Sequence, residues 1–303
     1  DASHPYPNAA SVSAGRRALD LARESRDAGW LVVLLSGGAS AMLVAPVAGV
    51  TLDDKIATAR ALMRAGIAID GLNCVRKHLS RIKGGQLAAA AARTMTLAIS
   101  DVHGPVADDP SVIGSGPTVG DPTTFAQAMA IVDSVSDVPA TVRRYFERGV
   151  RGEVPETIKP HDQRLSQGLY EIVGNRETAV GGAAEAARAL GYSVSIVPKA
   201  ITGEARDAAR AFLADARLAS VAAGTRLCVL AAGETTVTVT GNGLGGRNQE
   251  FVLAAAPDLA TIGRPAVLAS AGTDGVDGPT DAAGALADPT TLDRARRAGV
   301  DWQ

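Results

Sequence analysis

The fold class is decided by the stretch Leu31-Val32-Val33-Leu34-Leu35-Ser36-Gly37-Gly38-Ala39-Ser40. Its five consecutive aliphatic residues are typical of a strand in a parallel sheet. Serine and glycine follow directly, and these residues favour a tight turn into a helix. An alanine-rich helical pattern over residues 14–28 precedes the strand. The stretch therefore predicts a β-to-α unit of a parallel sheet.

The same alternation of short apolar strands and longer alanine-rich helical patterns continues along the chain, as in βαβ units. The polar segment 148–166 is the predicted linker. We therefore predict an α/β fold of two α/β domains with mostly parallel, Rossmann-like sheets, the first at 1–163 and the second at 164–303. Further strands are expected at 96–99, 170–173, 193–197, 227–231 and 266–270, and helices at 53–66, 125–132, 177–190, 203–219 and from 247 onward.

The composition argues against several function classes. The 303 residues carry a formal net charge of −2, so we expect no nucleic-acid partner and no membrane partner. No apolar run reaches the length of a membrane span and no signal-peptide pattern opens the chain, which predicts a cytoplasmic protein. The two cysteines are far apart, and the four histidines show no metal-ligand spacing. A disulfide framework and a Cys/His metal site are therefore not expected.

Two strand ends in the first domain carry candidate binding chemistry, because ligands in parallel α/β sheets bind beyond the carboxyl ends of strands. Gly37 and Gly38 allow the backbone to approach an oxyanion closely, and Ser36 can donate a hydrogen bond to it. An ordinary β-to-α turn is the alternative. Asp101, after the strand at 96–99, can hold Mg²⁺ or accept a proton from a hydroxyl. A local turn or helix cap is the alternative for Asp101.

A basic segment, residues 73–85, lies between these two strands. Its helical pattern has an apolar face that leaves Lys77 and Lys83 outside. A basic face is usually solvated surface. Lys83 followed by Gly84 and Gly85 before a new helix is also suited to cradle a triphosphate. Both lysines are therefore candidate phosphate ligands.

A glycine-rich stretch in the second domain reads Gly241-Asn242-Gly243-Leu244-Gly245-Gly246-Arg247-Asn248-Gln249-Glu250. It matches the G-x-G-x-x-G pattern of dinucleotide folds, but the acidic residue expected about twenty positions later has only Asp258 as a poor candidate. Arg247 is more informative, because a guanidinium at the positive end of a helix can fork onto phosphate or carboxylate. We favour an anion site here over a purely structural turn.

The predicted strand at 266–270 ends in a loop that contains Asp274, Asp277 and Asp281. Carboxylates spaced by glycines after a buried strand indicate a site for a hard cation or a hydroxyl. The EF-hand calcium pattern does not fit, because the acids do not alternate and loop position twelve has no glutamate. A solvated acidic turn is the alternative.

Taken in order, these segments resemble one family, the bacterial and animal glycerate 2-kinases whose C-terminal part is the MOFRL domain. The MOFRL-like part spans residues 225–303. The resemblance covers nearly the whole chain and rests on His4-Pro5-x-Pro7, Ser36–Ala41, Val75–Gly85, Ser100–Val102, Ile113–Thr118, Gly245–Glu250 and Gly272–Gly284.

The resemblance implies a two-domain fold with the active site in the cleft between the domains. It implies an ATP-dependent kinase that uses Mg²⁺ and converts D-glycerate into 2-phosphoglycerate, so that glycerate and nucleotide are its partners. The implied catalytic residues are Arg247, Asp101 and Asp274, and the implied Mg²⁺ ligands are Asp101, Asp274 and Asp277. The implied substrate and phosphate ligands are Ser36, Gly37, Gly38, Lys77, Lys83, Gly245, Gly246, Asn248 and Glu250.

Two other functions stay open on the sequence. One is a hydroxypyruvate reductase, which needs a nicotinamide site and has only residues 241–246 as a fingerprint. The other is a glycerate- or nucleotide-binding protein without activity. Family members carry a further segment before the His-Pro-x-Pro motif and a tail after the aspartate loop. We therefore expect this sequence to be part of a longer chain.

Overall fold

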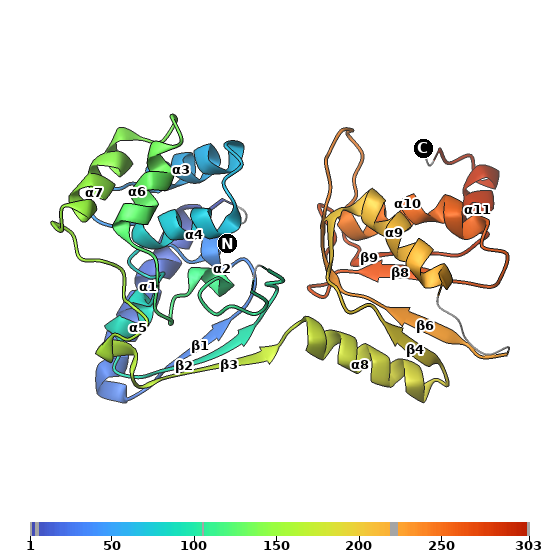
Figure 1. Ribbon diagram of the computed structural model, residues 1–303, viewed down its shortest axis with the longest axis horizontal. Coiled ribbons are helices and arrows are strands. Elements are labelled where there is room, and N and C mark those ends of the chain that lie inside the picture. Colours follow the sequence, from blue (N-terminus) through green and yellow to red (C-terminus); the bar gives the residue numbers. More distant parts are fainter. Residues whose placement is uncertain (1, 4–5, 105, 219–223, 302–303) are drawn as a thin grey trace. The chain divides into compact units, whose positions relative to one another are not determined.

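The computed structural model describes residues 2–3, 6–104, 106–218 and 224–301 (Figure 1). The chain forms two compact units, Asp1–Asn175 and Arg176–Gln303, which we call unit 1 and unit 2. Each unit has a hydrophobic core of its own. Each also combines helices with strands, which confirms the predicted α/β class. His4 and Pro5 of the His-Pro-x-Pro motif lie outside the described residues.

Unit 1 contains a three-stranded parallel sheet in the order β1 (Leu31–Leu35), β2 (Thr94–Ile99) and β3 (Gly168–Gly174). β1 and β2 pair from Leu31 opposite Thr94 to Leu35 opposite Ala98, so both strands end at the same edge. The parallel pairing confirms the prediction from the sequence.

The polar segment at 148–166, predicted as a linker, is packed inside unit 1. Thr157 and Ile158 are buried, and the short 3-10 helix η2 (Gln163–Leu165) leads into β3. Because β3 pairs with β2, unit 1 extends to Asn175. Residues 164–175, predicted from the sequence to belong to the second domain, therefore lie in unit 1.

Helices cover one face of the sheet. α1 (Ala9–Ala28) and α5 (Gln86–Ala90) form a buried cluster against Val33 of β1. The 3-10 helix η1 (Ile113–Ser115) places Ile113 against Leu35 and Ala98 at the ends of β1 and β2. This contact fixes the position of the turns that follow the two strands.

The other face of the sheet carries a row of exposed aliphatic side chains. Val32 and Leu34 of β1 are 58% and 78% exposed, and Leu169 and Val173 of β3 are 54% and 51% exposed. A continuous apolar strand in a parallel sheet is normally covered on both faces. Among the described residues, side chains of unit 1 pack against one face.

A second core of unit 1 lies among four helices and the loops that join them (Figure 1): α3 (Leu52–Arg64), α4 (Ile69–His78), α6 (Phe125–Asp133) and α7 (Ala140–Val150). Thr51 and Thr124 begin α3 and α6 as N-caps, and each forms a capping box with the residue three positions later. The rings of Phe125 and Phe146 pack edge to face, with centroids 5.9 Å apart. This core supports the buried side of α4.

Unit 2 begins with α8 (Arg176–Ala189), and its described residues form three two-stranded sheets. β4 (Ser193–Ile196) pairs in parallel with β6 (Leu227–Leu230), and β5 (Ile201–Glu204) pairs in parallel with β7 (Gly233–Thr236). β8 (Leu268–Ala271) and β9 (Gly284–Ala287) are antiparallel. The pairing is therefore mostly parallel, as predicted, with an antiparallel exception around the aspartate loop.

The core of unit 2 lies among α9 (Ala205–Leu218), α10 (Arg247–Ala260), α11 (Thr291–Arg297) and the pair β8–β9. Leu259 on α10 is fully buried in it. Within the part of the chain that the structure describes, no helix combines the length and the apolar character needed to span a membrane.

Candidate functional site

The turns after β1 and β2 lie next to each other in unit 1. Gly37 and Gly38 follow β1, and Gly38 adopts a left-handed conformation (φ 77°) as it begins the short helix α2 (Ala39–Met42). Asp101 follows β2. A Cβ atom on Gly37 would lie 2.6 Å from Oδ2 of Asp101, so the carboxylate sits directly against the glycine backbone. The parallel sheet thus brings two predicted site elements together.

The carboxylate of Asp101 is available for a ligand. Its side chain is exposed, and it has no hydrogen-bond or ion-pair partner among residues 6–104, 106–218 and 224–301. An exposed carboxylate without a partner can bind a hard cation or accept a proton from a hydroxyl group. Neither a turn nor a helix cap, the alternatives considered from the sequence, engages its oxygens.

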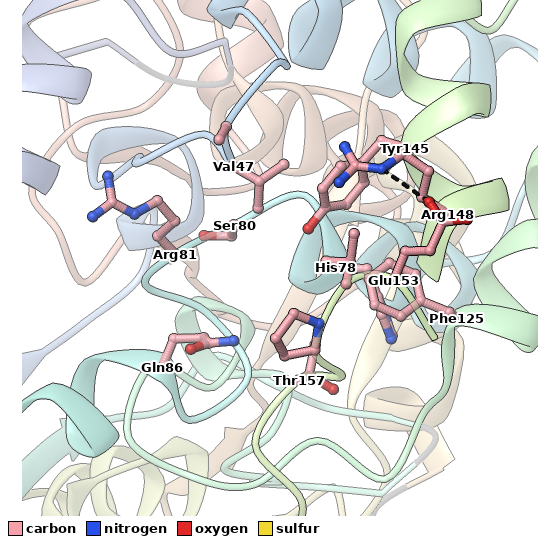
Figure 2. Close-up of a pocket in the computed structure, with 13 residues that line it drawn as sticks. Val47, His78, Ser80, Arg81, Gln86, Phe125, Tyr145, Arg148, Glu153 and Thr157 are labelled. Atoms are coloured by element: carbon pink, nitrogen blue, oxygen red, sulfur yellow. Dashed lines mark ion pairs between the residues drawn. The ribbon is translucent and has the colours of Figure 1, made fainter. Parts of the chain in front are cut away.

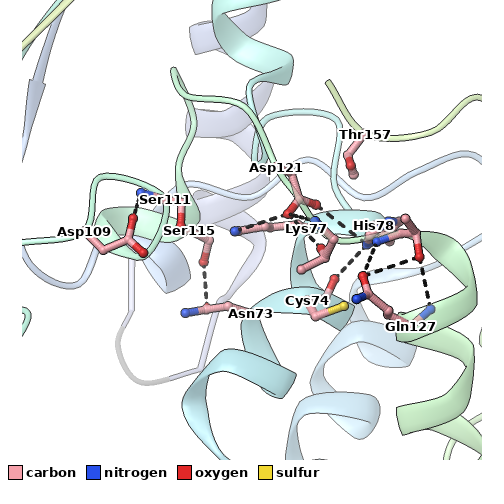
Figure 3. Close-up of polar contacts among 12 residues, drawn as sticks. Asn73, Cys74, Lys77, His78, Asp109, Ser111, Ser115, Asp121, Gln127 and Thr157 are labelled. Atoms are coloured by element: carbon pink, nitrogen blue, oxygen red, sulfur yellow. Dashed lines mark hydrogen bonds and ion pairs between the residues drawn. The ribbon is translucent and has the colours of Figure 1, made fainter. Parts of the chain in front are cut away.

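Lys83 lies buried beside α2. Its Nζ donates to the carbonyl oxygen of Ser40 at 2.8 Å and lies 3.2 Å from Oγ of Ser40. The Ser40 hydroxyl in turn lies 2.8 Å from that of Ser115. Figure 3 shows the next contact, in which the Ser115 hydroxyl donates to Oδ1 of Asn73 at 3.0 Å. Burial, followed by the charges of Lys55 and Arg76, lowers the pKa of Lys83 well below its usual value.

Lys77 is also buried, but its charge is already compensated. Its Nζ lies 3.4 Å from Oδ1 of Asp121, which is fully buried and also accepts a hydrogen bond from the Thr123 hydroxyl at 2.7 Å (Figure 3). Burial of Asp121 favours its neutral form. The charge of Lys77, the hydrogen bonds from Thr123 and the electrostatic effect of His78 outweigh burial and lower the pKa of Asp121. The solvated basic face considered from the sequence is absent at both lysines, which are 4% and 2% exposed.

His78 extends this polar group to the segment at 156–159. Its Nδ1 lies 2.8 Å from the carbonyl oxygen of Cys74, and its Nε2 lies 3.1 Å from Oε2 of Glu156. Glu156 also accepts a hydrogen bond from the backbone of Phe125 at 2.8 Å and pairs with Lys159 at 3.0 Å. These contacts fasten the end of α4 to α6, which is a structural task.

A cavity of about 360 Å³ opens beside the same end of α4 (Figure 2). Its lining includes Arg81, Tyr145 and the ion pair of Arg148 with Glu153. None of the residues predicted from the sequence as site residues lines it. The cavity therefore adds nothing to the candidate site at the ends of β1 and β2.

In unit 2, Asp277 caps the N-terminus of α10. It is 1% exposed, and its carboxylate accepts hydrogen bonds from the backbone of Asn248 at 3.0 Å and of Gln249 at 2.8 Å. Burial raises the pKa of Asp277, but these bonds and those from the two side chains outweigh burial and lower it. A Cβ on Gly246 would lie 2.4 Å from this carboxylate, so only glycine fits beside it.

Arg247 is the first residue of α10 and remains half-exposed. Its Nη1 lies 2.5 Å from Oε1 of Glu234 and 3.3 Å from the carbonyl oxygen of Thr235. Glu250, one turn later, forms an ion pair with Arg206. The guanidinium is therefore held at the positive end of a helix and is still accessible to an anion.

Two domain families match the chain: a domain of unknown function (DUF4147) at residues 1–147 and the MOFRL family at residues 227–303. The sequence is 37% identical to a glycerate 2-kinase of Pyrococcus horikoshii, across 99% of this chain and 68% of that protein. The crystal structure of a glycerate kinase from Thermotoga maritima matches with a TM-score of 0.83 and 34% identity, over 99% of this chain and 70% of that one.

This chain belongs to the glycerate 2-kinase family. A further relative, 41% identical over 99% of this chain and 68% of its own length, is named putative hydroxypyruvate reductase, from Agrobacterium vitis. The resemblance stated from the motifs is therefore confirmed by relatives that match nearly the whole chain.

The glycine-rich stretch of this family member is not arranged as a nicotinamide site. Residues 237–246 separate β7 from α10 without strand structure. The strand after α10 is β8, whose partner among the described residues is the antiparallel β9. A dinucleotide-binding βαβ unit needs parallel strands on both sides of its helix. The geometry around α10 therefore favours an anion site over a nicotinamide site.

The carboxylates differ in their suitability as Mg²⁺ ligands. Asp101 in unit 1 and Asp274 in unit 2 are exposed, and within the described part of the chain Asp274 accepts one hydrogen bond, a long one of 3.4 Å from the backbone N–H of Val276. Asp277 instead has its oxygens occupied by α10. No group of three or more His, Cys, Asp or Glu side chains that could hold a metal ion occurs in the described part of the chain.

Three residues with charged or polar roles were not found from the sequence: Asp121, His78 and Lys55. Asp121 and His78 become partners of Lys77 and Glu156 only through the tertiary fold. Lys55 did leave a signal. It stands seven positions before the buried Leu62, within the apolar stripe of α3, where a charged residue is out of place.

Proposed function

We propose that this protein transfers the terminal phosphoryl group of ATP to the 2-hydroxyl of D-glycerate, giving 2-phosphoglycerate and ADP. The proposal is carried by the close relatives named glycerate 2-kinase, which match 99% of the chain. It is supported by Asp101, whose unpartnered carboxylate lies against the glycine turn after β1. Phosphoryl transfer needs donors for phosphate oxygens and an acceptor for the proton of the attacking hydroxyl.

In unit 1 we assign the backbone amides of Ser36, Gly37 and Gly38 to an oxyanion of the substrate or nucleotide. Asp101 is assigned either to the proton of the 2-hydroxyl or to Mg²⁺. When bound, Mg²⁺ neutralises developing charge on the phosphate oxygens. The open position of Asp101 beside the glycine turn fits both tasks, because its oxygens are free.

In unit 2 we assign Arg247 to an anionic group, either the carboxylate of glycerate or a phosphate. The dipole of α10 and the guanidinium favour the same charge there. Gly245, Gly246 and Asn248 shape the turn at this helix end. Asp274, exposed in the next loop, is the second candidate for Mg²⁺ or proton acceptance. Asp277 is left out of this assignment, because it holds α10.

The test is a coupled assay of ADP release with D-glycerate, ATP and Mg²⁺, followed by chromatographic separation of 2- and 3-phosphoglycerate. We expect ADP release that depends on D-glycerate and a product of 2-phosphoglycerate. A parallel reaction contains hydroxypyruvate and NADH without ATP. NADH oxidation in that reaction, together with no ADP release in the first, would sink the kinase proposal and favour the reductase.

A further inference from the structure

A small cavity of about 40 Å³ in unit 1 is lined by three cationic side chains. Lys55 comes from α3, Arg76 from α4, and Lys83 from the turn after α4. Ser40 of α2, Thr58 of α3 and Tyr6 complete its polar lining. Neither Gly37 nor Asp101 is among the lining residues, but Ser40 follows Gly38 by two positions, so the cavity adjoins the turn after β1 without including Asp101.

The cations of this cavity have no negative partner. Nζ of Lys55 donates to the carbonyl oxygen of Leu79 at 2.8 Å, and Nζ of Lys83 interacts with Ser40. No carboxylate forms an ion pair with Lys55, Arg76 or Lys83 anywhere in the described residues. Lys77, next to Arg76 in sequence, shows the contrast, because the buried Asp121 balances its charge.

Three cations around one cavity are unfavourable unless an anion compensates their charge. Lys55 and Lys83 are 9% and 2% exposed, and buried charges are normally paired. Burial, followed by the charge of Arg76, lowers the pKa of Lys55 to about 7. Besides these three cations, the only other titratable residue in the lining is Tyr6. The cavity is therefore short of negative charge by more than one unit when its lysines are protonated.

We propose that this cavity binds a small tetrahedral oxyanion, held by Lys55, Arg76 and Lys83. The shared chemistry is a phosphate group, which is supplied either by inorganic phosphate or by the terminal phosphate of a larger ligand. One water needs roughly 10–15 Å³ of such space, so the cavity has room for a group of a few heavy atoms. Two ammonium groups and one guanidinium supply donors in excess of its oxygens.

Burial, charge and cavity size indicate phosphate binding here independently of the proposed kinase activity. A glycerate kinase with its catalysis at the turns after β1 and β2 could work without this cavity being filled. Conversely, the cavity binds phosphate in the absence of glycerate. Direct binding measurements without glycerate therefore test the cavity alone.

The experiment is calorimetric titration of inorganic phosphate into the protein in a chloride buffer free of phosphate and sulfate. We expect one phosphate per chain, with proton uptake at pH 8 because the anion restores the charge of Lys55. Lys55→Met and Arg76→Met should each weaken binding at least about tenfold, as loss of a charge-assisted contact does. Arg76→Lys should retain most of the affinity, and the exposed Lys199→Met is the matched control.

Melting temperatures distinguish a variant that has lost phosphate binding from one that has lost its fold. Without phosphate, Lys55→Met should melt no lower than the wild type, because burial disfavours the ammonium form of Lys55, and Val47 still donates to the Leu79 carbonyl. Phosphate should raise the melting temperature of the wild type and of Lys199→Met but not of Lys55→Met. Arg76→Met, at a half-buried position, repeats the test with less effect on the core.

The source of the phosphate is decided by adding ATP–Mg²⁺ to the titration. Displacement of phosphate from the wild type, absent in Arg76→Met, identifies the terminal phosphate of a nucleotide as occupant. Simultaneous binding of both identifies inorganic phosphate. The proposal is overturned if the wild type binds neither, or if Lys55→Met and Arg76→Met bind both as tightly as Lys199→Met does.

Discussion

Asp101, Asp121 and Asp277 carry the same carboxylate in three environments, and the environment decides what each can do. Asp101 is exposed beside a glycine turn, and its oxygens have no hydrogen-bond partner among the described residues. Asp121 is fully buried and balances Lys77. Asp277 is buried at a helix end and is held by backbone N–H groups. Residue type alone indicates a possible ligand, whereas burial and partners select the task.

Asp277→Asn should destabilise the protein, because an amide cannot accept from both backbone N–H groups of α10. We expect the free energy of unfolding at pH 7 to fall by about 1–3 kcal/mol. The folded-state pKa of Asp277 lies below its ordinary value. Its stabilisation is therefore present at neutral pH and is lost as the pH falls below about 4.

Urea unfolding of Asp277→Asn and the wild type at pH 7 and at pH 3.5 measures the stabilisation by Asp277 at each pH. Asp281→Asn, in the same loop and exposed, is the control and should be near wild type at both pH values. If the free energies of unfolding of Asp277→Asn and the wild type differed by the same amount at both pH values, the capping role of Asp277 would be contradicted.

Gly37→Ala should abolish most kinase turnover while leaving folding intact. The new methyl group would lie 2.6 Å from Oδ2 of Asp101 and must displace that exposed carboxylate. We expect turnover to fall at least about tenfold, in line with loss of a positioned catalytic group. The ADP-release assay measures it. Gly182→Ala, where an added Cβ meets nothing within 4 Å, should retain full activity.

Arg247→Lys and Asp274→Asn should each cut turnover at least about tenfold, with melting temperatures near that of the wild type. The lysine keeps the charge but loses the fork that binds an oxyanion through two hydrogen bonds. Arg210→Lys and Asp215→Asn, both exposed on α9, are the matched controls. Near-normal turnover in both site variants would refute their assignment to the site.

At the scale of elements, the period of apolar residues predicted most helices and strands to within a few positions. α3, α6 and α8 begin or end close to where the pattern placed them. α1 begins at Ala9, five residues earlier than predicted, because Asn8 and Ser11 form a capping box at its start. Such a box depends on two polar side chains, and an alanine-rich helical pattern does not reveal it.

Pairing between distant segments was harder to predict. Short strands such as β5 and β9 carry too few residues to show a period. The antiparallel pairing of β8 with β9 is set by the loop that joins them, in which Asp277 donates its backbone N–H to Ala282 at 2.7 Å. Likewise, the burial of Lys77 depends on Asp121, 44 residues away. The approach of Asp101 to Gly37, by contrast, follows from the parallel order of β1 and β2.

Asp121→Asn should weaken the attachment of α4 to the rest of unit 1. The change leaves Lys77 buried without its counter-charge, which typically costs about 3–5 kcal/mol. Urea unfolding should show this loss, and hydrogen exchange should show weaker protection over 69–78. Asp137→Asn removes a carboxylate that is 67% exposed and pairs with Arg64, so its effect should stay within about 0–1 kcal/mol.

At the scale of the whole molecule, the chain consists of two units with separate cores. The core of unit 1 is built around Phe125 and Phe146, and that of unit 2 around α9 and α10. The sequence predicted two α/β parts but placed their division near a polar segment. Polarity and prolines at 148–166 were an unreliable sign of a linker, because Glu156 in that segment binds buried partners of unit 1.

Leu259→Ala should lower the stability of unit 2 and leave unit 1 unchanged. Leu259 is fully buried, and truncation of a buried leucine costs about 2–5 kcal/mol. Hydrogen exchange followed by mass spectrometry should show faster exchange confined to 176–301. Leu253→Ala on the same helix, at a position 42% exposed, is the control. Equal loss of protection in both units would contradict independent cores.

The exposed row on the sheet of unit 1 has a practical consequence for work with the purified protein. Val32, Leu34, Leu169 and Val173 present aliphatic surface on one sheet, and such surface attracts other apolar surface as concentration rises. We therefore expect this apolar face, rather than the net charge, to limit the solubility of the protein. Val32→Thr would keep a β-branched residue in the strand and make this face of the sheet more polar.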